Sequence, residues 1–187
     1  MWSQDRYTAA ASFAAEAHLR QTVPTGELPY LLHVTLVAME VAAALRAEPG
    51  HDEDLAICCA LLHDTVEDTP VTYEQLAGRF GEAVADGVLA LSKDEGLPDD
   101  EQIPDSLRRI REQPREVWLV KLADRIVNLQ PPPKHWRPEK VAAYKAQSRD
   151  ILAALGEASP LLAARLAGKI EGYGSSPSTS SSPTAMR

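Results

Sequence analysis

The segment LAICCALLHDTVEDT, residues 55–69, constrains the fold more than any other part of the chain. Its first eight residues are apolar on every face of a helix, so this helix has to be surrounded by other helices. The run then ends in four ionisable side chains: His63, Asp64, Glu67 and Asp68. A solvated, charged helix end is one interpretation. Because the helix dipole and a surrounding core both disfavour carboxylates at this position, the cluster favours the alternative, a bound cation.

The remainder of the sequence predicts an all-α fold, a single helical-bundle domain over residues 1–173 followed by a disordered tail over 174–187. Ala and Leu are abundant, and the alternation typical of strands is nearly absent. The tail, GSSPSTSSSPTAMR, has too little apolar surface to pack against a core. We expect helices over about 3–20, 30–47, 53–64, 83–91, 115–129 and 138–155. Shorter helices are expected after the capping box at 72–75, around Arg108–Arg111 and after Ser159, and a polar loop over 92–104.

Composition excludes several classes of partner. The chain has 187 residues and a formal net charge of −8, which disfavours nucleic acid and anionic membranes as bulk partners. No apolar stretch is long enough to span a membrane, and the N-terminus lacks a signal-peptide pattern, so we expect a cytoplasmic protein. Cys58 and Cys59 are adjacent in a helix and are expected to be buried, unpaired thiols. The oligomeric state stays open, a homo-oligomer included.

Two further segments place polar side chains in apolar surroundings. His33 lies in YLLHVTLVAMEV, where a core histidine bonded to a carbonyl is the simpler interpretation. In VWLVKLADRIVNL, Lys121, Asp124 and Asn128 share one stripe of a helix that is otherwise mostly apolar. The alternative for this stripe is a partly exposed helix with an internal Lys121–Asp124 pair.

Taken together, these segments predict a metal site with two imidazole and two carboxylate ligands: His33, His63, Asp64 and Asp124. A mixed nitrogen and oxygen set without Cys is typical of Mn²⁺, Fe²⁺ or a similar ion with open coordination positions. Such an ion lowers the pKa of bound water and neutralises phosphate charge. Glu67 and Asp68 are then the expected acid–base groups beside it.

The same residues resemble a known family. His33, His63–Asp64 and Asp124 match the H…HD…D pattern of HD-domain metal-dependent phosphohydrolases. The segments AASFAAEAHLRQ, PYLLH, ALLHDTVEDT, YEQLAGRFGEAVADGV and VKLADRIVNL resemble, in order, the hydrolase domain of RelA/SpoT homologues, especially stand-alone small alarmone hydrolases. These segments cover most of residues 9–155.

The resemblance implies an HD fold and Mn²⁺-dependent removal of the 3′-pyrophosphate from guanosine tetra- or pentaphosphate. It implies that Glu67 and Asp68 activate or position the attacking water while the four predicted ligands bind the metal. It also implies nucleotide contacts by polar side chains, to which we add Lys93, the only basic residue of the loop after Leu91, and Lys121 of the polar stripe. The set is Asn128, Lys140, Tyr144, Lys93 and Lys121. Trp136 precedes Lys140 and Tyr144 in a similar W…R…Y arrangement, with Lys140 in place of Arg.

Other features leave the nucleotide open. Family members usually carry a basic cluster before the PYxxH segment, whereas this chain has QTVPTGEL there. An adenosine alarmone, a nucleoside monophosphate or NADPH is therefore an alternative substrate. A catalytically inactive, nucleotide-binding regulator is a further alternative, which the complete set of ligands and acid–base residues disfavours.

Overall fold

The computed structural model describes residues 1–23 and 26–174, and within them the chain is all-helical, as predicted. Outside the helices, the described part has one isolated bridge between Thr22 and Pro29. The helices, in chain order, are α1 (Gln4–Ala17), α2 (Leu31–Ala47), α3 (Glu53–Leu62), α4 (Thr65–Asp68), α5 (Tyr73–Phe80), α6 (Glu82–Leu91), α7 (Asp99–Arg111), α8 (Arg115–Asn128), α9 (Pro138–Leu155), a 3-10 turn η1 (Gly156–Ala158) and α10 (Pro160–Gly172). The predicted disordered tail, apart from Gly174, lies outside the described residues.

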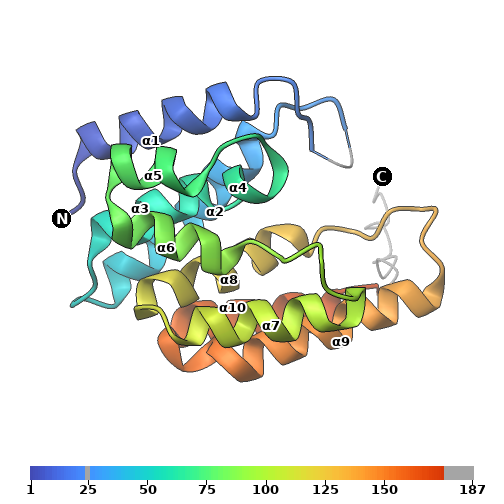
Figure 1. Cartoon of the computed structure of the whole chain (residues 1–187). Coiled ribbons are helices and arrows are strands. Elements are labelled where there is room, and N and C mark those ends of the chain that lie inside the picture. The colour runs from blue at the N-terminus through green and yellow to red at the C-terminus, as the bar shows by residue number, and fades with distance from the viewer. Residues whose placement is uncertain (24–25, 175–187) are drawn as a thin grey trace, which may run out of the picture.

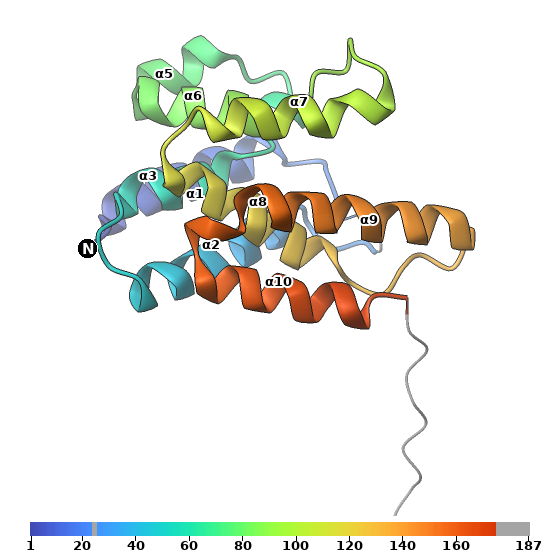
Figure 2. The ribbon, with the colours of Figure 1, turned by 90° about the horizontal axis from the view of Figure 1, so that it is seen from below.

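Helix α8 occupies the middle of the bundle (Figures 1 and 2). It packs against α2, α3, α9 and α10, and every residue from Glu116 to Val127 is buried. Helix α3 is buried along its whole length from Leu55 to Leu62, as its uninterrupted apolar sequence predicts. The core therefore surrounds the two helices from which we predicted three of the four metal ligands.

Local sequence signals explain where several helices begin. The Ser3, Asp52 and Ser159 side chains each accept a hydrogen bond from a backbone N–H in the first turn of the helix that follows. The predicted capping box is present, with Thr72 and Gln75 each accepting from the other's backbone N–H. These caps fix the ends of the helices around the core.

Two differences from the sequence prediction concern the site, besides the end of α1, which lies at Ala17 and not near residue 20. Helix α3 ends at Leu62, and a separate short helix, α4, follows Asp64. The Thr65 hydroxyl donates to the Leu62 carbonyl (2.7 Å), satisfying an end of α3 that a continuous helix would have bonded through its backbone.

The predicted polar loop over 92–104 is the second difference, because its second half is the first part of α7. Acidic residues in the first turn, beginning with Asp99 and Asp100, favour a helix start through the dipole. The loop was predicted from the polar composition of residues 92–104, whereas the helix accommodates residues 99–104, including Pro104, which lacks the N–H for one helical bond. No helix in the described part is both long and apolar enough to cross a membrane.

Close packing at Gly87 gives a testable consequence for stability. A Cβ added there would lie 2.8 Å from Cys59 Sγ and 2.9 Å from Val117 Cγ2, at the junction of α6, α3 and α8. Gly87→Ala is therefore expected to lower the free energy of unfolding by about 1–3 kcal/mol through overpacking. Gly78→Ala is the matched control, because nothing lies within 4 Å and Ala favours a helix by about 0.5–1 kcal/mol. Urea titration of both variants measures the difference, and equal stabilities would contradict this packing.

Candidate metal centre and active site

The four predicted metal ligands meet at one point between α2, α3, α4 and α8. Histidine atom Nε2 of His63 lies 3.0 Å from Asp64 Oδ2 and 3.3 Å from His33 Nε2. His33, His63 and Asp64 can each offer one ligand atom within 4.8 Å of the others. Asp124 completes the cluster from α8, with Oδ1 3.4 Å from His33 Nε2 and 3.8 Å from His63 Nε2. The four side chains therefore come from three segments that are distant in the sequence: α2, the break between α3 and α4, and α8.

The His63 ring is oriented by its other nitrogen. Its Nδ1 lies 2.8 Å from the Ala60 carbonyl oxygen, which can only accept a hydrogen bond. Nδ1 therefore carries a hydrogen, so Nε2 is the nitrogen that faces the cluster and, once deprotonated, can offer its lone pair to a metal. A backbone carbonyl that fixes the tautomer in this way is the usual support of a metal-binding histidine.

The charges in the cluster favour ionised carboxylates. Burial raises the pKa of Asp64, but the charge of His63 and hydrogen bonds from both imidazoles outweigh it and hold that pKa well below its usual range. Burial also raises the pKa of Asp124, but the hydrogen bond from His33 and the charge of Lys121 outweigh it and hold that pKa well below its usual range. Burial lowers the pKa of His33, yet hydrogen bonds to Asp124 and Asp64 raise it to about 9. Protons on the imidazoles thus supply positive charge that a metal cation could supply instead. Two nitrogen and two oxygen donors fit a divalent transition metal.

Tyr30, at the start of α2, supports this cluster, and we did not single it out from the sequence. Its hydroxyl donates to Asp64 Oδ2 (2.5 Å), and its ring centroid lies 5.1 Å from that of His33. Burial and the charge of Asp64 raise the pKa of the Tyr30 hydroxyl well above its ordinary value, so it stays a donor. Its place within PYLLH, three residues before His33, was the available signal.

The predicted acid–base residues lie on α4, beside the ligands. Glu67 accepts from the backbone N–H of Lys93 (2.8 Å) and also forms an ion pair with the Lys93 ammonium. Asp68 accepts from the side-chain amide of Gln21 at 2.9 Å. Burial, Asp64 and Glu67 raise the pKa of Asp68, while the Gln21 hydrogen bond opposes the rise. The two neighbouring carboxylates therefore have different partners.

A cleft with a polar half and an apolar half opens at the cluster. The polar half, about 390 Å³, is lined by Asp64, Asp124, Glu67 and Asp68 among others. The apolar half, about 400 Å³, reaches from His33 to Trp136 and has no Lys, Arg, Asp or Glu among its lining residues in the described part. Three residues line both halves, which therefore adjoin: Tyr30, Asn128 and Tyr144.

The structure brings four of the five predicted substrate-binding residues to this cleft. Asn128 donates to Asp124 Oδ1 at 2.5 Å, and buried Lys121 lies 3.6 Å from Asp124 Oδ2, so the predicted stripe of α8 does face the site. Lys93 and Tyr144 also line the polar half. Lys140 lines neither half, and its ammonium lies 4.5 Å from the centroid of the Trp136 ring. A direct role for Lys140 stays a prediction.

Several lining residues were not among those predicted from the sequence. Arg125 lies with its guanidinium 4.3 Å from the Tyr144 ring centroid and donates to Gln147, and all three line the polar half. Asp99 and Gln102 reach it from the first turns of α7. The sequence prediction of a loop at these positions hid the periodicity that points them inward.

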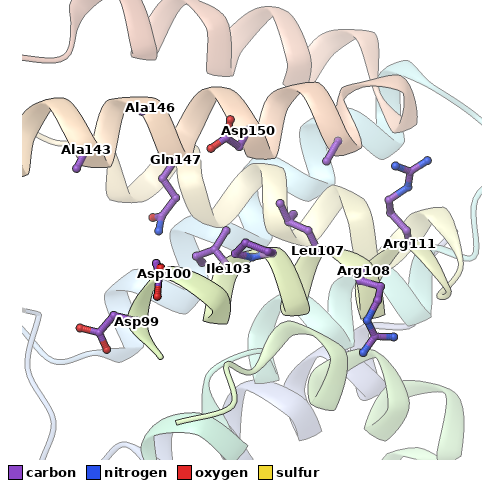
Figure 3. Close-up of a pocket in the computed structure, with 12 residues that line it drawn as sticks. Asp99, Asp100, Ile103, Leu107, Arg108, Arg111, Ala143, Ala146, Gln147 and Asp150 are labelled. Carbon is purple, nitrogen blue, oxygen red and sulfur yellow. The ribbon is translucent and has the colours of Figure 1, made fainter. Parts of the chain in front are cut away.

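A second hollow, of about 810 Å³, lies between α7 and α9 (Figure 3). Asp99 and Asp100 lie at one end and Arg108 and Arg111 at the other, with Ala143 and Ala146 of α9 along one side (Figure 3). It shares Asp99, Ile103 and Gln147 with the polar half of the cleft. None of the four predicted metal ligands lines it, so it is distinct from the candidate active site.

Comparison with known proteins agrees with this geometry. The HD domain family matches residues 10–161. The guanosine-3′,5′-bis(diphosphate) 3′-pyrophosphohydrolase MESH1 of Xenopus tropicalis is 32% identical over 162 residues, covering 84% of this chain and 88% of the relative. A guanosine-3′,5′-bis(diphosphate) 3′-pyrophosphohydrolase of Aquifex aeolicus is 40% identical over 64% of this chain, which spans 17% of that longer protein.

A solved structure has a similar fold. It was described as "A metazoan ortholog of SpoT hydrolyzes ppGpp and plays a role in starvation responses", and it aligns with a TM-score of 0.77 at 25% identity. The alignment covers 93% of this chain and 98% of that one. The length of the family match, the relatives and the shared fold lead to one conclusion: the chain belongs to the HD-domain family.

Proposed function

We propose that this protein is a divalent-cation-dependent hydrolase that removes the 3′-pyrophosphate of guanosine 3′,5′-bis(diphosphate), giving GDP and pyrophosphate. Guanosine pentaphosphate would give GTP in the same way. The observation that carries the proposal is the union, in one cleft, of a two-imidazole, two-carboxylate centre with two further carboxylates on α4. Relatives that cover most of this chain are named for this reaction.

The charge balance of the polar half supports a role for a cation. Its lining includes five carboxylates, Asp64, Glu67, Asp68, Asp99 and Asp124, but only three basic side chains, Lys93, Lys121 and Arg125. A substrate with several phosphate charges would be repelled unless additional positive charge were present. We propose Mn²⁺, held by His33, His63, Asp64 and Asp124, because this donor set suits it. A bound divalent cation supplies Lewis acidity that polarises a phosphoryl oxygen and activates a water nucleophile.

The two halves of the cleft suit the two parts of a nucleotide. The pyrophosphate would lie in the polar half, where the three basic side chains can neutralise its oxygens. The base would lie in the apolar half, beside the rings of Trp136 and Tyr144, which contact each other edge to face with centroids 5.5 Å apart. Asn128 and Tyr144 line both halves and are placed to contact the ribose.

The carboxylates on α4 supply the proton transfers. Both oxygens of Glu67 already accept hydrogen bonds from Lys93, which holds this side chain in one orientation. Asp68 accepts through Oδ2 only, among the described residues, and its Oδ1 is available to accept a proton from water. The raised pKa of Asp68 brings it closer to the range in which a general base works. We therefore assign the base to Asp68 and the orientation of water and Lys93 to Glu67.

A second candidate reaction uses a different nucleotide. No Lys, Arg, Asp or Glu lines the described apolar half, so ion pairs with these side chains do not select a particular base there. A nucleoside monophosphate or NADPH would fit the same description but would release orthophosphate. The identity of the product separates the two reactions.

Product analysis tests the substrate. With Mn²⁺, the protein is expected to convert guanosine 3′,5′-bis(diphosphate) to GDP and pyrophosphate, and a chelator is expected to stop the reaction. Anion-exchange chromatography of a nucleotide panel, with a pyrophosphate assay, measures both products. Release of orthophosphate without pyrophosphate, from this or another nucleotide, would support the second candidate instead. Nucleotide binding without turnover would support the inactive-regulator alternative.

Metal content tests the ligand set. His63→Ala and Asp64→Ala each remove a donor, and each is expected to weaken Mn²⁺ binding by more than about tenfold, the smallest loss common for outer partners of a metal site. His135→Ala is the histidine control, because His135 is exposed and lines neither half of the cleft. Calorimetric titration of metal-free protein gives the affinities. Unchanged binding in His63→Ala would contradict the assignment.

Separate variants test the acid–base residues. Asp68→Asn keeps the shape of the side chain but removes its basicity, so kcat is expected to fall by about 10²–10⁴ while Mn²⁺ affinity is retained. Glu67→Gln releases the Lys93 ion pair and is expected to lower kcat as well. Steady-state kinetics beside metal titration measures both effects. If Asp68→Asn lost the metal together with activity, Asp68 would be a ligand and not a base.

A further inference from the structure

A chain of hydrogen bonds leads from a buried histidine at the end of α1 to the exposed carboxylate of Asp68. His18, which ends α1, is 3% exposed, and its Nδ1 lies 2.7 Å from Gln21 Oε1. Gln21 Nε2 in turn donates to Asp68 Oδ2 at 2.9 Å. His18 and Gln21 line neither half of the cleft, so they reach the reaction only through Asp68 and the neighbouring Tyr30 ring, 4.9 Å from His18 between centroids.

The direction of each hydrogen bond in this chain follows from chemistry. An ionised carboxylate only accepts, so the amide nitrogen of Gln21 has to face Asp68 and the amide oxygen has to face His18. That oxygen also only accepts, so His18 Nδ1 carries the hydrogen. The other ring nitrogen, Nε2, is buried without a protein partner in the described part. The His18 ring is thus committed to one hydrogen bond, which orients the Gln21 amide.

The backbone of Gln21 is also fixed. Its N–H donates to the His18 carbonyl and its carbonyl accepts from the Tyr30 N–H, both at 2.9 Å. Asp68, in contrast, is an exposed residue at the end of a four-residue helix. The Gln21 amide is therefore the one described hydrogen-bond donor that limits rotation of the Asp68 carboxylate, and it leaves Oδ1 free.

We propose that Gln21 is a positioning residue for Asp68, and that His18 sets the direction of the Gln21 amide. The inference rests on the proposed hydrolase function, since it concerns the orientation of the base. A carboxylate with Oδ2 tethered presents Oδ1 in one direction, and loss of the tether spreads it over several rotamers. Turnover should then fall while substrate binding and metal binding stay unchanged.

Two variants of Gln21 test the tether. Gln21→Ala removes the donor, and Gln21→Glu keeps the shape but places a carboxylate against Asp68. Each is expected to lower kcat about 10–100-fold, the effect typical of a group that orients an active-site residue, with KM and Mn²⁺ affinity within about twofold of the unaltered protein. Thr22→Ala is the matched control, because the exposed Thr22 side chain makes no described hydrogen bond and its loss should leave kcat unchanged.

A double-mutant cycle distinguishes positioning from a general loss of structure. If Gln21 acts through Asp68, Gln21→Ala in an Asp68→Asn background is expected to change the remaining kcat by no more than about twofold. Additive losses, or a raised KM together with weaker metal binding, would show a structural role and overturn the proposal. An unchanged kcat in Gln21→Ala, with an active unaltered protein, would overturn it as well.

Variants of His18 test the second link. His18→Asn keeps an N–H near the position of Nδ1 and is expected to retain most of kcat, whereas His18→Leu is expected to match Gln21→Ala. Thermal unfolding of both variants identifies any that fail to fold. Equal kcat values in folded His18→Asn and His18→Leu would remove His18 from the proposal.

The chain also has a readout that does not need turnover. In ¹H–¹⁵N spectra with diamagnetic Mg²⁺, the Gln21 side-chain amide is expected to shift in Asp68→Ala, and His18 is expected to show a hydrogen on Nδ1. If the unaltered protein left every tested nucleotide intact, the proposed function would fail while these spectra still tested the tether. An amide resonance insensitive to both Asp68→Ala and His18→Leu would overturn the tether itself.

Discussion

The arrangement of this site depends on one constraint: two negative charges in an apolar helical bundle need compensating groups around them. Asp64 and Asp124 lie beside helices whose other side chains are buried, where an unpaired carboxylate is strongly destabilised. Both imidazoles lie beside both carboxylates. In addition, the Tyr30 hydroxyl donates to Asp64, the Asn128 amide donates to Asp124, and Lys121 forms an ion pair with Asp124. A cation at the centre of these groups would provide the positive charge that protons on the imidazoles only partly provide. On the proposed function, the same cation would serve both the reaction and the burial of the two carboxylates.

The side chains of the site come from helices of very different length. The long, buried α8 brings Lys121, Asp124 and Asn128 to the site on one rigid stripe. The two proposed acid–base residues, in contrast, lie on α4, a single turn after the break at His63–Asp64. Ligands on long helices keep their spacing, whereas Glu67 and Asp68 need partners outside their own helix, and Lys93 and Gln21 provide them. The short helix therefore depends on the loops that flank it.

Sequence patterns predicted most of the fold and the centre of the site, because both depend on local periodicity. The apolar run before His63 and the polar stripe of α8 each specify a buried helix and the side from which its polar groups point. The predicted start of α7 was wrong because the polar composition of residues 92–104 was interpreted as a loop, whereas the helix begins at Asp99. Tyr30 and Arg125 escaped notice for another reason: their roles arise from contacts across the fold, with Asp64 and Tyr144, that no spacing along the chain encodes.

The two carboxylates on α4 carry the same functional group but have different neighbours, which give them different charge environments. Glu67 has both oxygens bound by Lys93, so a positive group stabilises its charge and holds its orientation. Asp68 faces the uncharged amide of Gln21 and the negative charges of Asp64 and Glu67, and these with burial raise its pKa. A base works best when its charge is not already neutralised by a fixed cation. The neutral donor on Asp68 orients the carboxylate without reducing its basicity as much as a lysine would, and for this reason we propose different tasks for these two adjacent acids.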